Sequence, residues 1–139
     1  PWRSDSMYAE ILSAFTDAEN DFPIHHRYDS VKFVQRKTKD LKFHTTYWVP
    51  WLKGQIMYHV ILTVMNHPLI YTLMAQHNLN FGAPNTFWIR LADLARKHAT
   101  WISRLIDKTT DRQIELTYPF FGYAAAVAAT VHLYLLLQR

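Results

Sequence analysis

The fold is decided by the stretch Phe87-Trp-Ile-Arg-Leu-Ala-Asp-Leu-Ala-Arg-Lys-His-Ala-Thr-Trp-Ile-Ser-Arg-Leu-Ile106. Apolar side chains recur in it every three or four residues, and charged side chains occupy positions between them. Residues three and four apart share one face of an α-helix, so this stretch predicts one amphipathic helix of about six turns. The predicted inner face consists of Phe87, Leu91, Leu94, Ala95, His98, Ile102, Leu105 and Ile106.

Helical patterns also lie on both sides of this stretch. We expect helices over residues 6–19, 30–41 (with Val31 and Val34 inward), 48–66 (with Pro50 in the first turn), 69–76 and 119–137, separated by turns at 20–28, 78–85 and 109–117. The chain has only three glycines and six prolines, too few turn signals for a β-sandwich. The sequence therefore predicts an all-α fold: a bundle-like array of about five to six helices, without a sheet, in a single domain over residues 1–139.

Composition narrows the function classes. The chain contains no cysteine, so it has no disulfide, no thiolate nucleophile and no cysteine-ligated zinc site. Its net charge of +4 is modest. The basic run from Lys32 to Lys42 is expected to be a solvated surface, with contact to phosphates or an acidic partner as the alternative.

The closing stretch, Pro119 to Leu137, contains no charged residue and is about as long as a membrane span. Its alanines contribute little to transfer into lipid, and His132 is costly there. We therefore expect a buried core helix. The alternative is a small membrane or membrane-associated protein that uses Trp48–Met65 and Pro119–Leu137 as spans.

Catalytic and metal-binding patterns are weak. The eight histidines lack His-x-x-x-His spacing, and the acidic residues lie on expected exposed faces, so we predict neither a metal site nor an enzyme and rank a histidine-based enzyme third. A ligand pocket is the stronger hypothesis, because polar residues four apart on the 48–66 helix lie among tryptophans. The alternative is that these side chains only fill the core. The predicted pocket wall consists of Trp48, Trp51, Gln55, His59, Thr63 and Trp101.

Several blocks, taken in order, resemble a known family. They are Trp48-Val-Pro-Trp51 through Tyr58-His59, Asn66-His67-Pro68-Leu69, Phe87-Trp88 through His98-Ala99, Pro119-Phe120-Phe121-Gly122-Tyr123, and Ala128-Ala129-Thr130-Val131-His132. Their order and spacing over residues 23–136 are similar to the regulatory middle homology region of fungal zinc-cluster transcription factors. No single block is specific by itself.

This resemblance implies an all-helical region that restrains or licenses transcriptional activation and catalyses nothing. It implies nuclear localisation and a small-molecule effector or transcriptional co-regulator as partner, with homodimerisation through exposed helix faces as a further expectation. Zinc is expected only in an N-terminal six-cysteine cluster, which this cysteine-free chain lacks, so we expect no direct DNA contact and no cofactor here. The chain starts without a methionine or a secretory signal, and we expect a middle to C-terminal fragment of a larger regulatory domain.

Overall fold

The computed structural model describes residues 3–70, 72 and 85–137. Within these residues there are helices and no strands, so the prediction of an all-α array is confirmed. We expected one domain, and the chain divides into two compact units, Pro1–Arg36 and Lys37–Arg139. Each unit is described by itself.

The first unit is built around α1 (Met7–Asp21), close to the predicted helix. Ser6 caps it, because the Ser6 hydroxyl accepts a hydrogen bond from the Ala9 N–H at 3.2 Å. The chain then forms short turns: η1 (Ile24–His26), α2 (Tyr28–Val31) and η2 (Phe33–Gln35). Arg27 closes the end of α1, since its guanidinium donates to the carbonyl of Asn20 at 3.0 Å.

The predicted basic helix over 30–41 is wrong. The backbone turns left-handed at Lys32, with φ of 51°, and a separate helix, α3 (Thr38–Phe43), follows in the second unit. Val31 and Phe33 are both buried although they lie two residues apart, a spacing that one helix face does not provide. Val34, predicted to face inward, is exposed.

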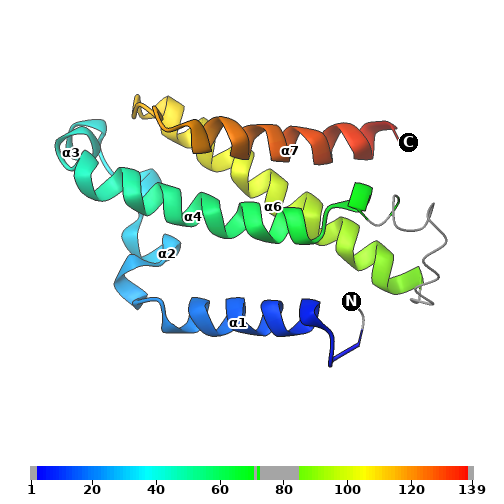
Figure 1. The fold of residues 1–139 in the computed structure, drawn as a ribbon. Helices are drawn as coiled ribbons and strands as arrows, with labels where there is room; N and C mark the ends of the chain where they lie inside the picture. Colours follow the sequence, from blue (N-terminus) through cyan, green and yellow to red (C-terminus); the bar gives the residue numbers. More distant parts are fainter. Residues whose placement is uncertain (1–2, 71, 73–84, 138–139) are drawn as a thin grey trace. The chain divides into compact units, whose positions relative to one another are not determined.

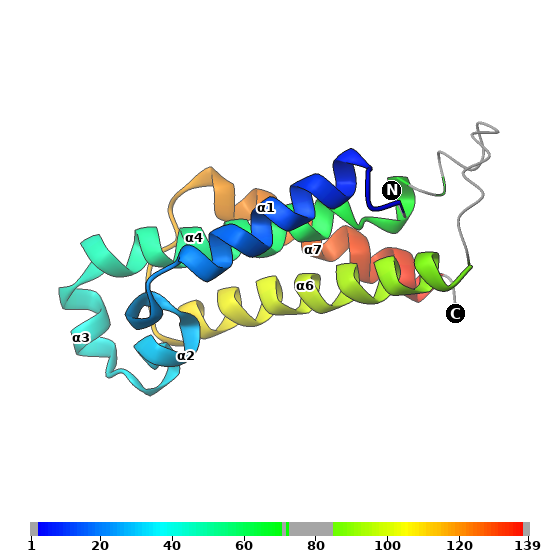
Figure 2. The ribbon, with the colours of Figure 1, turned by 90° about the horizontal axis from the view of Figure 1, so that it is seen from below.

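The second unit is formed mainly by α4 (Thr45–Met65), α6 (Asn85–Asp111) and α7 (Pro119–Leu137), which run side by side and each contact the other two (Figure 1, Figure 2). α6 confirms the predicted amphipathic helix and extends it at both ends. α4 begins three residues before the predicted start, so Pro50 lies in its second turn. The predicted helix over 69–76 lies mostly outside the described residues. The predicted turn at 78–85 lies almost wholly outside them.

α7 is only partly a core helix. Its buried residues form one stripe, Phe121, Ala124, Ala128 and Val131, against the other two helices. The opposite side is exposed and apolar, with Leu133 58% and Leu136 63% exposed. α7 is also long and apolar enough to cross a membrane, with mean hydropathy of 1.7, although 28% of that span is buried against protein.

The connection from α6 to α7 begins with a left-handed turn at Gln113, where φ is 55°. The Ile114 N–H donates to the Thr109 carbonyl at 3.2 Å and the Gln113 N–H donates to the Thr110 carbonyl at 2.8 Å, the two bonds of a Schellman motif. Glycine is the usual residue at this position. Here the Gln113 side chain accepts a hydrogen bond from Lys42 Nζ at 2.9 Å, which ties α3 to the connection.

Candidate functional site

The polar stripe of α4 lies where the sequence predicts, on the side of the helix that faces its neighbours. Thr63, Asn66 and His67 are buried, and Gln55 and His59 are half-buried. Within the described residues, every buried side-chain nitrogen or oxygen has a hydrogen-bond partner. The stripe therefore carries no buried unpaired polar atom in that part of the chain, and its buried members act first as contacts within and between helices.

A pair of histidines joins α4 to α6. His59 Nδ1 and His98 Nδ1 lie 2.9 Å apart, so one imidazole donates the proton between them and the other accepts it. Trp101, one turn after His98 on α6, stacks on the His59 ring with centroids 5.7 Å apart and an interplanar angle of 3°. His59 is thus held on two sides, by a hydrogen bond and by an aromatic face.

The environment of this pair keeps His59 neutral. Burial, followed by the nearby His98 and Lys97, lowers the pKa of His59 from 6.5 to about 4. A base with so low a pKa takes up protons poorly at neutral pH. The pair is therefore suited to fixing the contact between two helices and unsuited to general base catalysis.

A second histidine joins the end of α4 to α7. His67 Nδ1 accepts from the Leu69 N–H at 3.2 Å, which leaves the ring proton on Nε2. Nε2 then donates to the Thr130 hydroxyl at 3.2 Å, and that hydroxyl donates to the Val127 carbonyl at 2.8 Å. Burial lowers the pKa of His67, in keeping with this neutral form. The three long helices are therefore linked by specific polar contacts as well as by apolar packing.

The six residues of the predicted pocket wall fall into two groups. Trp48 and Trp51 are buried and meet edge to face, with ring centroids 5.6 Å apart. His59 and Thr63 lie about two and three turns beyond Trp51 on α4, and Trp101 meets the His59 ring from α6. Gln55 lies between the groups. The Thr63 hydroxyl donates to the His59 carbonyl at 2.7 Å, so its proton is already used.

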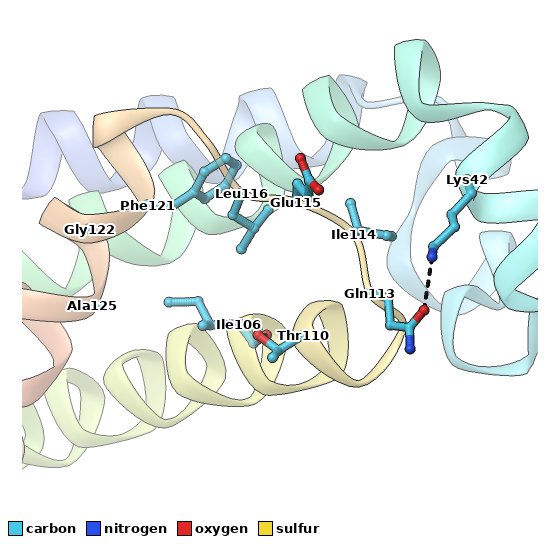
Figure 3. A pocket seen from close by; sticks show the side chains of 10 residues that line it. All are labelled: Lys42, Ile106, Thr110, Gln113, Ile114, Glu115, Leu116, Phe121, Gly122 and Ala125. Atoms are coloured by element: carbon cyan, nitrogen blue, oxygen red, sulfur yellow. Dashed lines mark hydrogen bonds between the residues drawn. The ribbon is translucent and has the colours of Figure 1, made fainter.

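One groove of about 620 Å³ lies elsewhere, between the end of α6 and the start of α7 (Figure 3). None of the predicted wall residues lines it. Its lining consists of Lys42, Ile106, Thr110, Gln113, Ile114, Glu115, Leu116, Phe121, Gly122 and Ala125. The pocket hypothesis at Trp48 to Trp101 stays a prediction, because this groove neither supports nor contradicts it.

Sequence reasoning missed two features of these sites. The pairing of His59 with His98 joins residues 39 apart, and only the position of each on an inner helix face signalled it. The bond between Lys42 and Gln113 had no signal, because no glycine or asparagine marks the left-handed turn. Among the described residues, no cluster of three or more histidine, aspartate or glutamate side chains is arranged to hold a metal ion.

Comparison of the chain with protein-family models, with curated proteins and with solved structures finds no match in any of the three. The resemblance to zinc-cluster regulatory regions therefore stays a prediction.

Proposed function

We propose that this chain is a regulatory region of a fungal-type transcription factor, which controls transcription and catalyses no reaction. The observation that carries the proposal is the outer face of α7, which is apolar, uncharged and exposed over most of its length. An exposed apolar surface of this extent is typical of a site that binds another protein. The family resemblance of the sequence blocks adds the transcriptional role and the nuclear location.

The linked helices provide a mechanism for regulation. α4, α6 and α7 meet at polar contacts such as His59 with His98 and His67 with Thr130. A ligand or co-regulator that binds one arrangement of these helices more tightly shifts the population toward it. The outer face of α7 moves with its helix, so the partner surface is presented differently in the two arrangements.

A reporter assay tests the proposal. Residues 1–139 are placed between a DNA-binding domain and an activation domain in a fungal cell, and a flexible linker of equal length replaces them in the control. We expect the chain to change reporter output relative to the linker. Equal output from the two fusions contradicts a regulatory role.

The coding sequence upstream of Pro1 tests the family. We expect six cysteines there, in two Cys-x-x-Cys-x-x-x-x-x-x-Cys triplets. An open frame that continues upstream without them contradicts the assignment to zinc-cluster factors.

The second candidate is a membrane-associated protein, which the length and hydropathy of α7 favour. The packing opposes it, because α6 lies against α7 and carries eight charged side chains from Arg90 to Asp111. Each charge costs about 2.5–3.5 kcal/mol at the centre of a bilayer. α7 can therefore span lipid only if it leaves α6. A chain that stays soluble and monodisperse without detergent contradicts the membrane function.

A further inference from the structure

The exposed side of α7 has a seven-residue repeat. Gly122, Ala129 and Leu136 lie seven apart on it, and Ala126 and Leu133 follow the same interval. All five are exposed. Residues seven apart lie nearly in line along a helix, so they form one straight seam, the arrangement by which two helices pack together.

Side-chain size changes along this seam. Its first half carries only small residues: Gly122, Ala126 and Ala129. Its second half carries Leu133 and Leu136, which project into solvent. A helix that runs in the opposite direction brings large residues against small ones along the whole seam. A parallel helix brings leucine against leucine and leaves the small half in poor contact.

The small half of the seam adjoins the groove of about 620 Å³. Gly122 lines this groove together with Leu116 and Phe121, and the groove opens beside the first turns of α7 (Figure 3). A Cβ atom added at Gly122 would meet no atom within 4 Å. The groove can therefore receive an apolar side chain from outside at the point where the seam begins.

We propose that a second copy of this chain covers the outer face of α7, with the two α7 helices antiparallel. Ala129 lies at the two-fold axis, and Leu136 of each copy enters the groove beside Gly122 of the other. Such an interface is self-complementary, as two-fold symmetry requires. This inference rests on the proposed use of the face for protein binding, and it names the partner.

The electrostatics agree with this partner, and the area of the face predicts a weak dimer. No charged side chain lies between Pro119 and Leu137, so two copies meet without repulsion. Antiparallel helices place the positive end of one dipole near the negative end of the other. The face of a 19-residue helix is about 28 Å long and about 10 Å wide, which is below the roughly 800 Å² per partner of a standard interface. The dimer is therefore weak and depends on concentration.

The absence of cysteine makes the arrangement directly testable by disulfide crosslinking. Ala129→Cys lies at the axis and is expected to crosslink to itself under mild oxidation. The Leu136→Cys variant alone is not expected to crosslink to itself. A mixture of the Leu136→Cys and Gly122→Cys variants is expected to form the disulfide-linked mixed dimer. Self-crosslinking of Leu136→Cys as readily as Ala129→Cys overturns the antiparallel arrangement, because disulfides need Cα atoms within about 7 Å.

Sedimentation of the full chain in detergent-free buffer measures the association itself. Gly122→Leu closes the groove and should lower the association constant about tenfold or more, a loss of about 1.4 kcal/mol. Gly54→Leu, on α4, is the matched control, because it makes the same change at another helical glycine with open space. It should leave association unchanged. Ala129→Leu should also weaken the dimer, although it adds apolar surface.

Three outcomes overturn the proposal. The first is a chain that stays monomeric at every concentration. The second is stronger association of the Ala129→Leu variant, which indicates nonspecific hydrophobic association. The third is binding of the chain to phosphatidylcholine vesicles in place of dimerisation. Each leaves the reporter assay of the proposed function unaffected. A monomeric chain that still regulates the reporter would show that only the partner was assigned wrongly.

Discussion

The two faces of α7 have nearly the same composition and opposite surroundings. The inner face, with Phe121, Ala124, Ala128 and Val131, is buried against α4 and α6. The outer face, with Leu133 and Leu136, is exposed. Hydrophobicity alone therefore does not identify the core of this protein. The difference lies in what each face meets.

The largest expected effect is the difference in stability loss between a substitution on the inner face of α7 and one on its outer face. Phe121→Ala removes a buried ring, and we expect it to lower the free energy of unfolding by about 3–5 kcal/mol. Leu136→Ala on the outer face is expected to change it by no more than about 0.5 kcal/mol. Urea denaturation at low protein concentration measures both. Similar losses in the two variants would mean that the outer face is covered within the monomer.

Acid should destabilise the contact between α4 and α6. The pKa of His59 is about 4 in the folded chain and near 6.5 when unfolded. Between these values the unfolded state binds more protons, so stability is complete above pH 6.5, falls as the pH drops to about 4, and then levels off. The loss is about 3 kcal/mol at most. His67, whose pKa is also lowered, acts in the same direction.

Denaturation measured from pH 7.5 to 3.5 follows this loss, with His59→Leu as the control. The variant should show a flatter dependence on pH. An equally steep profile without His59 would assign the proton uptake to other groups.

Breaking the histidine pair should have a somewhat smaller effect. His98→Leu leaves Nδ1 of His59 without its 2.9 Å partner, and we expect a loss of about 1–3 kcal/mol. The double variant with His59→Leu as well should be more stable than the sum of the two single losses predicts, because neither ring is then left unpaired. Strictly additive losses in this double-mutant cycle would contradict the pairing.

The smallest expected effect concerns the turn that joins the two helices of the groove. Gln113→Gly relieves the left-handed backbone but loses the bond to Lys42, whereas Gln113→Ala loses the bond and keeps the strain. The glycine variant should therefore be more stable than the alanine variant by about 1–2 kcal/mol. Thermal denaturation compares them, and the reverse order would contradict the left-handed turn.

The sequence correctly predicted those elements whose pattern of apolar and polar residues fits only one type of secondary structure. The apolar stripe of residues 87–106 fits only a helix, and α6 confirms it. Residues 30–41 were predicted wrongly, because the break at Lys32 has no glycine to signal it and depends on burying Val31 and Phe33 together. Residues 119–137 are apolar on nearly all sides, so hydrophobicity alone does not indicate which face meets α6.

The candidate site was predictable only in part. The inward position of His59 and Thr63 followed from their spacing on α4. Their partners did not, because the pairing of His59 with His98 depends on how α4 and α6 align in space. The groove beside Gly122 depends on the angle at which the chain turns after α6, which local sequence does not determine.

Our central claim is that the outer face of α7 serves regulation and contributes little to folding. The most direct measurement compares reporter regulation and unfolding free energy for the double variant Leu133→Ser/Leu136→Ser. We predict near wild-type stability together with loss of regulation. Regulation that persists in this folded variant would contradict the claim.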